Sequence, residues 1–329
     1  MDARRLVLAL VLLCAAAALP WIAPTYYVQF ATKVLIMGTA AMALNLAVGF
    51  GGLVSMCHAA FFGTAGYALA LATPETGPAS IWLALPIAIG AAGLLALAIG
   101  ALSLRTRGVY FIMVTLAFGE MLFFLFHDTA IAGGSDGTYV YFKPTIAIAG
   151  RTLIDLGRPA AFYGLVLTLT VAVILLLAAI TGSPFGRALA ATRDNERRAR
   201  SLGFPVYRVR LVAYTISGAL AGLAGFFAAA QFGFVAPQHL GWHQSATILV
   251  MVVLGGMGSV TGPLVGAVVL LGLEEVLKAT TAHWKLIEGA IVILLVLTLP
   301  GGARQLARLV LPGRDQPAAA GVRREAAGG

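Results

Sequence analysis

Ten apolar runs follow one another along most of the chain, separated by short polar or glycine-rich segments. Several are about 20 residues long, the length that an α-helix needs to cross roughly 30 Å of hydrocarbon. The runs are Leu6–Ala23, Val34–Val54, Cys57–Thr73, Ile81–Leu104, Val109–His127, Ala161–Thr181, Leu211–Gln231, Ala246–Gly258, Gly262–Lys278 and Trp284–Leu299. They predict an all-α polytopic membrane protein with about ten transmembrane segments.

The composition excludes an ordinary soluble domain. Only 11% of the residues are charged and 60% are hydrophobic, whereas a soluble domain carries about 25% charged residues. The 39 glycines fit a membrane bundle, in which small residues let helices approach closely. The net charge of +9 does not call for nucleic acid as a partner, because basic residues in a membrane chain mark the loops on the cytoplasmic side.

The distribution of basic residues predicts the topology. With the N-terminus inside and ten crossings, 16 of the 22 lysines and arginines fall in inside segments, which supports cytoplasmic termini. An eight-span version with one re-entrant pair keeps the same sidedness. We therefore expect a transmembrane permease domain over residues 1–312, with an outer loop at 128–160 and a cytoplasmic loop at 182–210, followed by a disordered cytoplasmic tail at 313–329.

Two pairs of neighbouring runs meet at glycine-rich junctions without a charged hinge, GFGGLVSMCH and GGMGSVTG. Short, glycine-broken segments in both halves of a chain predict discontinuous helices around a pathway near the midplane. Asn45, Ser55 and His58 cluster around the first junction. Two roles are open for these side chains: lining the pathway, or forming hydrogen bonds between helices. Glu120 lies within the run LAFGEML and predicts a pathway group or an interhelical hydrogen bond, unless it marks a helix end.

The segment Gly182–Arg210 holds seven arginines against Asp194 and Glu196. Ser183-Pro184 is a helix start, and Gly203 followed by Pro205 is a helix stop, which predicts about five turns of helix between them. Two interpretations stay open: a solvated loop whose arginines set the topology, or a surface helix docked in a groove of a cytoplasmic partner. The candidate docking face consists of Ala188, Thr192, Ala199 and Leu202.

The chain shows no motor or catalytic centre of its own. No G-x-x-x-x-G-K-[ST] motif occurs, and GGMGSVTG lacks the lysine of a phosphate-binding loop. ATP-driven transport would therefore need a separate ATPase subunit. His239 and His243 are interpreted as interfacial histidines without a metal, and no catalytic set is apparent, so we expect neither enzymatic activity nor a cofactor bound by this chain.

Several segments of the chain resemble segments of one protein family, and they occur in the same order as in that family. GRALAATRDNERRARSLGFPVYRVRL resembles the cytoplasmic loop of the LivM family, membrane subunits of bacterial ABC importers for branched-chain amino acids. LNLAVGFGGLVSMCHAAFFGTAGYALA, RTRGVYFIMVTLAFGEMLFF, GGSDGT and ILVMVVLGGMGSVTGPLVGAVVL are similar to its early glycine-rich segment, middle signature, periplasmic loop and late tandem segment. Together the similarities cover most of Leu44 to Leu273.

The resemblance implies partners and roles. It implies a LivH-like permease, two cytoplasmic ATPases that use ATP and Mg²⁺, and a periplasmic substrate-binding protein, assembled in the lipid of the bacterial inner membrane. It implies that Gly186–Gly203 is the coupling helix; the candidate ATPase-coupling residues are Gly186, Arg187, Glu196, Leu202 and Gly203. The resemblance also implies that the flexible outer turn is a gate or a contact with the binding protein. The candidate residues of this turn are Gly133, Gly134, Ser135, Asp136 and Gly137.

The leading hypothesis is thus the translocation subunit of an importer for branched-chain or hydrophobic amino acids. The same architecture importing urea, short amides or aromatic solutes is an alternative. A second class is an ion-coupled transporter or channel working alone, which should show more intramembrane carboxylates than Glu120 and Glu288. The third class, an intramembrane enzyme, lacks a catalytic constellation.

Overall fold

The predicted helical membrane bundle is what the structure shows. The computed structural model describes residues 3–74, 77–130, 133–148, 151–154 and 156–298. Each of the ten apolar runs overlaps one α-helix, and two more helices lie in the basic segment. The helices are α1 (Ala3–Ile22), α2 (Thr25–Asn45), α3 (His58–Ala72), α4 (Ile81–Ser103), α5 (Val109–Asp128), α6 (Pro159–Gly182), α7 (Pro184–Asp194), α8 (Glu196–Ser201), α9 (Val206–Phe232), α10 (Trp242–Gly255), α11 (Gly262–Thr280) and α12 (Trp284–Thr298).

Five of these helices are long and apolar enough to cross a membrane, counted over the described residues. They are α2 with its π-helical extension Leu46–Phe50 (η1), α4, α5, α6 and α9. Of the other apolar helices, α3, α10 and α12 are shorter, and α11 carries three charged residues. The structure therefore supports a multi-pass membrane protein without fixing the number of complete spans at ten.

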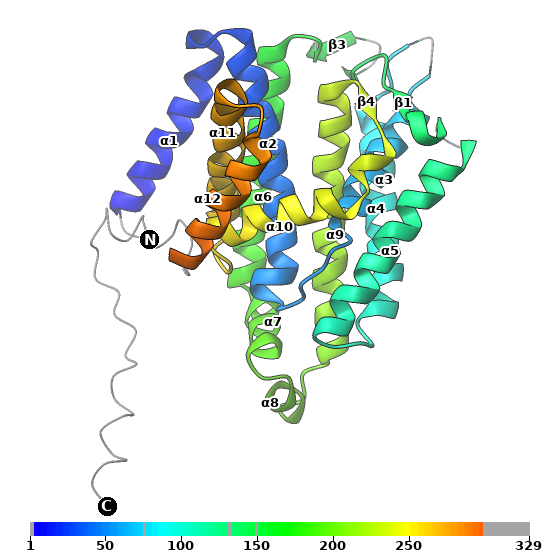
Figure 1. Ribbon diagram of the computed structural model, residues 1–329, viewed down its shortest axis with the longest axis vertical. Coiled ribbons are helices and arrows are strands. Elements are labelled where there is room, and N and C mark those ends of the chain that lie inside the picture. The colour runs from blue at the N-terminus through cyan, green and yellow to red at the C-terminus, as the bar shows by residue number, and fades with distance from the viewer. Residues whose placement is uncertain (1–2, 75–76, 131–132, 149–150, 155, 299–329) are drawn as a thin grey trace, which may run out of the picture.

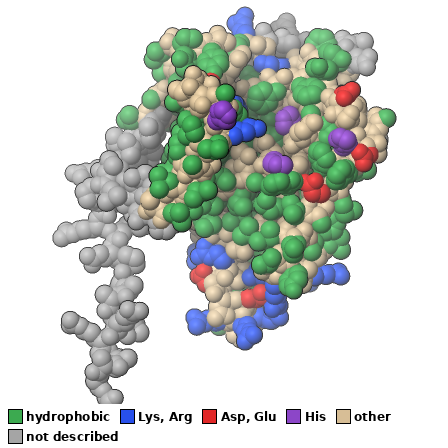
Figure 2. All heavy atoms as spheres, in the orientation of Figure 1, with side chains coloured by type: hydrophobic (Ala, Val, Ile, Leu, Met, Phe, Trp, Pro, Cys, Tyr) green, Lys and Arg blue, Asp and Glu red, His purple; other side chains and the backbone are tan. Residues whose placement is uncertain are grey.

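The two ends of the bundle differ in charge. Figure 1 shows α2, α6 and α9 upright in the bundle, with α7 and α8 at one end and the short strands at the other. Most of the lysines and arginines visible in Figure 2 lie around the α7–α8 end, and a few lie toward the opposite end. The strands form two small antiparallel pairs, β1 (Thr138–Tyr139) with β4 (Phe234–Val235) and β2 (Ile146–Ile148) with β3 (Arg151–Ile154).

Small residues let α9 approach its neighbours closely. A Cβ atom at Gly218 would lie 2.3 Å from the Ala96 Cβ, and one at Gly225 would lie 1.9 Å from the Phe62 carbonyl oxygen. The facing side of α4 repeats alanine every fourth residue, which places these residues on one helical face. These buried alanines are Ala84, Ala88, Ala92 and Ala96. The small residues thus serve helix packing, as expected where lipid gives no hydrophobic drive between helices.

Both glycine-rich junctions interrupt helices, as predicted. The first non-helical stretch separates η1 from α3, and the second separates α10 from α11. In Figure 1, α10 lies across the bundle at mid-height, and α3 begins inside it. The first junction is mostly buried apart from Gly52, whereas the second is exposed at Met257 and Thr261. Irregular backbone at membrane depth is tolerated where it is buried in protein or lines water.

One boundary differs from the prediction in a way that matters. The second apolar run was expected to begin after Lys33, but α2 begins at Thr25. Lys33 therefore lies within the helix, on its third turn. An apolar run is bounded by its first charge, whereas a helix can carry a charged side chain if that chain faces a cavity.

The close contact at Gly225 gives a stability test. We expect Gly225→Ala to lower the free energy of unfolding by about 1–3 kcal/mol, because the added methyl meets backbone that cannot yield. Gly164→Ala is the matched control, since a Cβ at that exposed position of α6 has nothing within 4 Å. The thermal midpoint in detergent measures both variants. A midpoint for Gly225→Ala equal to that of the control would contradict the packing.

Candidate functional site

The two junctions meet at the side chain of Asn45. Its amide nitrogen donates to the Ser259 carbonyl at 2.8 Å, and its amide oxygen accepts from the Gly258 N–H at 3.2 Å. Gly49 lies against the same side chain, since a Cβ there would be 2.1 Å from the Asn45 oxygen. Asn45 is 1% exposed, so one neutral side chain satisfies backbone groups of the second junction inside the bundle.

Arg193 of α7 connects the basic end to both junctions. Its guanidinium donates to the Gly49 carbonyl at 2.5 Å, within the π-helical extension of α2, where carbonyls near a helix end lack partners. Its aliphatic stem packs against Gly52, and the guanidinium lies beside Gly258. Composition does not distinguish Arg193 from the other six arginines of the segment, so the sequence analysis missed it.

Ser55 and His58 belong to a second, fully buried polar cluster. The His58 Nε2 lies 2.7 Å from the Ser217 Oγ, and its Nδ1 lies 3.2 Å from the Ser55 Oγ. Ser55 is in turn 2.9 Å from the Tyr214 hydroxyl, and Ser217 donates to the Ala43 carbonyl at 2.5 Å. These bonds join the start of α3 to α9 and α2. The geometry is that of interhelical hydrogen bonding, and none of these side chains lines the large cavity described below.

Glu120 holds the start of α10. One of its carboxylate oxygens accepts from the Trp242 N–H at 3.1 Å, and Trp242 is the first residue of α10. The free N–H groups and the positive dipole of a helix N-terminus both favour a carboxylate there. The structure thus gives the mid-helix carboxylate of α5 a partner on another helix.

The basic segment forms two helices, not the single five-turn helix that was predicted. Asn195 interrupts it with extended backbone angles, φ −155° and ψ 97°, and its side chain accepts from the Arg198 N–H at 3.0 Å. Asn is a strong helix N-cap, which explains why α8 restarts there. The predicted ends are confirmed: Ser183 caps α7, and Gly203, with φ +83°, ends α8.

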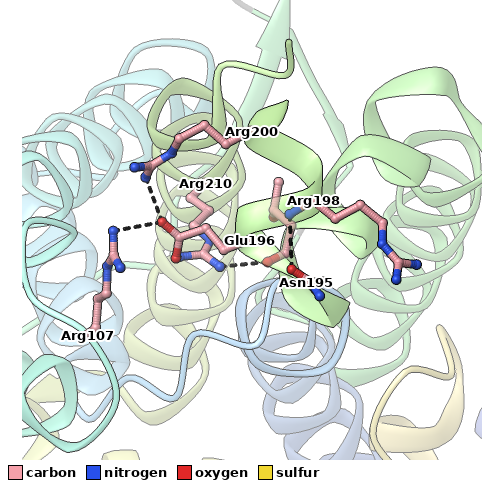
Figure 3. A network of polar contacts seen from close by, with 7 residues as sticks. Arg107, Asn195, Glu196, Arg198, Arg200 and Arg210 are labelled. Carbon is pink, nitrogen blue, oxygen red and sulfur yellow. Dashed lines mark hydrogen bonds and ion pairs between the residues drawn. The ribbon is translucent and has the colours of Figure 1, made fainter. Parts of the chain in front are cut away.

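Glu196 binds three arginines from three parts of the chain (Figure 3). One oxygen lies 2.7 Å from Arg200 and 3.0 Å from Arg107 in the α4–α5 turn; the other lies 3.0 Å from Arg210 of α9. Arg210 also donates to the Thr192 carbonyl at 2.7 Å. Because Glu196 is directed at these arginines, it fixes α8 against the bundle.

The small apolar face of the segment is not available to a partner. Ala188, Thr192 and Ala199 are at most 7% exposed because they pack against the same chain. The predicted docking through this face is therefore wrong for three of its four residues. Leu202, by contrast, is 68% exposed.

The five candidate coupling residues take different positions. Gly186 is buried in the first turn of α7, and Glu196 and Gly203 build the internal structure of the helix pair. Arg187 is exposed, although one guanidinium nitrogen donates to the Gly182 carbonyl at 3.1 Å. Arg187, Leu202 and Gly203 are thus the candidates on the surface, and Arg187 and Leu202 are the two that present a side chain there.

The glycine-rich outer loop is a compact turn. The 3-10 helix η3 (Gly134–Asp136) is flanked by Gly133 and Gly137, with φ of +83° and +75°, which explains the need for glycine there. Gly137 leads directly into β1, which pairs with β4. Ser135 and Asp136 are exposed, and the Ser135 hydroxyl donates to the Asp136 carboxylate at 3.2 Å. The loop therefore presents Asp136 at the surface from a turn that leads into β1.

A cavity of about 910 Å³ opens between α2, α3, α9, α10, α11 and α12. Most of its wall is apolar, and its charged groups are Lys33, Glu274, Lys285 and Glu288. The apolar runs leave Lys33 outside the second segment and place Glu288 within the last one, and nothing in the sequence pattern connects the two residues.

His239 and His243 also line this cavity. The His239 Nδ1 accepts from the Ala236 N–H at 3.4 Å, and burial lowers the pKa of His239 below its ordinary value. His243 stacks on Trp242. Within the described ranges, no three His, Cys, Asp or Glu side chains are grouped to hold a metal ion.

Glu120 allows a test that separates a structural carboxylate from a titrating one. We expect Glu120→Ala to lower the free energy of unfolding by about 1–2 kcal/mol through loss of the bond to Trp242. Glu120→Gln keeps an acceptor oxygen, so it should retain most of the stability and transport. The thermal midpoint and solute uptake measure both. Abolished transport in a stable Glu120→Gln protein would show that the charge itself is required in the pathway.

Comparison with known proteins identifies the family. Residues 26–297 match the family model described as branched-chain amino acid transport system / permease component. The chain is 33% identical over 320 residues to the high-affinity branched-chain amino acid transport system permease protein LivM of Escherichia coli (strain K12). That alignment covers 90% of this chain and 74% of LivM, and the LivM protein of Salmonella typhimurium is 32% identical with the same coverage.

A more distant similarity covers less of the molecule. The autoinducer 2 import system permease protein LsrC of Escherichia coli O9:H4 (strain HS) is 33% identical over 162 residues, 44% of this chain and 47% of LsrC. No solved structure matches the chain. The long matches to the family model and to LivM confirm the resemblance seen in the sequence motifs: the chain belongs to the family of permease components of branched-chain amino acid transport systems.

Proposed function

We propose that the chain is the permease subunit of an ABC importer that moves branched-chain amino acids across the bacterial inner membrane. The observation that carries the proposal is the similarity to LivM along 90% of the chain. The importer would comprise a LivH-like second permease, two cytoplasmic ATPases that consume ATP and Mg²⁺, and a periplasmic substrate-binding protein. This subunit would bind no cofactor and catalyse no reaction itself.

The charge distribution supports an orientation. The α7–α8 end carries the arginine cluster, so it would face the cytoplasm. The opposite end, with η3 and the short strands, would face the periplasm and offer Asp136 to the binding protein. Residues 1–312 would form one permease domain. The proposed tail at 313–329 lies outside the described residues.

The α7–α8 pair is suited to transmit movement. An ATPase would contact its exposed surface around Arg187 and Leu202. Glu196 and its arginines keep the pair rigid, so a displacement at the surface is passed on instead of being absorbed. Arg193 would carry that displacement to Gly49 and to the Asn45-linked junctions, where the helix breaks allow the pathway to change shape.

Other functions have less support. Import of urea, short amides or aromatic solutes by the same architecture is not favoured, since the LivM proteins that match along 90% of this chain are named for branched-chain amino acids. An ion-coupled transporter should show more intramembrane carboxylates than Glu120 and Glu288, and Glu120 already accepts a hydrogen bond from the start of α10.

Reconstitution tests the proposal. The chain is co-expressed with the permease, ATPases and binding protein encoded beside it, and uptake of labelled leucine is measured in proteoliposomes. We expect uptake that requires ATP and the binding protein and that unlabelled isoleucine and valine suppress, whereas urea and aromatic solutes do not. Leucine uptake by this chain alone, unaffected by removal of the ATPases, would refute the importer.

The role of Arg193 gives a second test. We expect Arg193→Gln to reduce leucine uptake at least tenfold while ATP hydrolysis by the assembled transporter continues, because α7 loses its bond to Gly49. Arg208→Gln, an exposed arginine at the start of α9, is the matched control and should transport normally. Normal uptake by a folded Arg193→Gln transporter would contradict the transmission route.

A further inference from the structure

Lys33 occupies an unusual position for a cation. It lies on the third turn of α2, partly buried, and lines the cavity of about 910 Å³. It also lines an adjoining cavity of about 250 Å³ on the side of α2 that faces Phe162. Within the part of the chain that the structure describes, no hydrogen bond or ion pair engages its ammonium group. A charge inside a membrane bundle is costly unless a partner offsets it, so an unpaired lysine facing a cavity marks a ligand site.

The opposite charge enters the same cavity from another wall. Glu288 of α12 and Glu274 of α11 both line it. Glu274 is already engaged by Lys278, four residues along α11. Glu288, in contrast, forms no hydrogen bond or ion pair with another residue in the described ranges. Among the charged residues that line the cavity in the described ranges, Lys33 and Glu288 have no hydrogen bond, ion pair or ring contact, whereas Glu274 pairs with Lys278 and Lys285 lies over the Trp284 ring.

The wall between these charges is apolar. Its side chains include Met37, Val250, Leu270, Leu271 and Val292. The volume is in the range of small-molecule sites, which combine an apolar lining with a few polar groups that fix orientation. Such a lining suits a branched aliphatic side chain, and a lysine and a glutamate in the same cavity suit the two charges of a zwitterion.

We propose that this cavity is a binding site for a zwitterionic aliphatic amino acid, with Lys33 binding the carboxylate and Glu288 the ammonium group. The proposal rests on the proposed importer function and assigns solute recognition within the membrane to this chain. Lys33 and Glu288 are then specificity residues: they distinguish amino acids from apolar solutes and from amines or acids that carry one charge.

Direct binding to the assembled transporter tests the site. The complex is reconstituted in nanodiscs without the binding protein and without ATP, and equilibrium binding of labelled L-leucine is measured. L-leucinamide, which lacks the carboxylate, and 4-methylpentanoate, which lacks the ammonium group, serve as competitors. We expect leucine to bind at least tenfold more tightly than either, since each lost contact is a hydrogen bond between charged groups.

Variants assign each contact to its residue. Lys33→Gln should weaken leucine at least tenfold and leave leucinamide nearly unchanged, and Lys33→Arg should restore leucine binding. Glu288→Gln should weaken leucine and leave 4-methylpentanoate nearly unchanged. Arg208→Gln, at the opposite end of the bundle, is the control. If a variant does not fold, the comparison of the three ligands on the wild-type transporter still decides the question.

Three results would overturn the site. The first is equal affinity of the wild type for leucine and leucinamide. The second is an equal loss of affinity for both ligands in Lys33→Gln. The third is the absence of saturable leucine binding, as when a phospholipid or the second permease fills the cavity. The uptake experiment keeps the two proposals apart. ATP-dependent leucine uptake without such binding contradicts the site alone, whereas absent uptake contradicts the importer itself.

Discussion

The hydrogen bonds from Asn45 to Gly258 and Ser259 hold together the two places where the helices of the bundle are broken. Irregular backbone inside an apolar bundle exposes N–H and C=O groups, and each unsatisfied group there costs several kcal/mol. One amide side chain offers both a donor and an acceptor, so it can serve both kinds of group. Arg193 adds a third connection at the Gly49 carbonyl. The junctions and α7 therefore form one polar assembly within an otherwise apolar protein.

The small residues of α9 and α4 make this assembly possible. Because Gly218 and Gly225 admit Ala96 and Phe62 into contact with the helix backbone, α3 and α4 lie close against α9. This packing brings His58 at the start of α3 to Ser217 and fixes the end of the first junction. The packed helices thus surround two breaks that Asn45 and Arg193 hold together by hydrogen bonds.

Much of this architecture could be predicted from the sequence. Apolar length located all ten bundle helices, and glycine content located both breaks. Capping residues gave the start of α7 and the end of α8, since these signals are local. The break between α7 and α8 at Asn195 has an equally local cause, the N-cap preference of Asn. It was not predicted because the segment was interpreted as one amphipathic helix.

The rest depends on contacts between distant residues. The bond between Glu120 and Trp242 joins positions 122 apart, so a mid-run carboxylate alone could not reveal the capped helix. Arg193 differs from its six neighbouring arginines only in facing Gly49. Lys33 was placed outside the bundle because a charge ends an apolar run, whereas in the fold its side chain reaches a cavity.

The central claim is that α7–α8 and the junctions move as one unit when the ATPases act. Electron–electron distance measurements between spin labels at positions 197 on α8 and 257 in the second junction test it most directly, in the nucleotide-free and ATP-trapped transporter. We expect one distance that is the same in both states, and a broadened distribution when Arg193 is replaced by Gln. A distance that shifts by several ångströms between the two states, in a transporter that still imports leucine, would contradict the account.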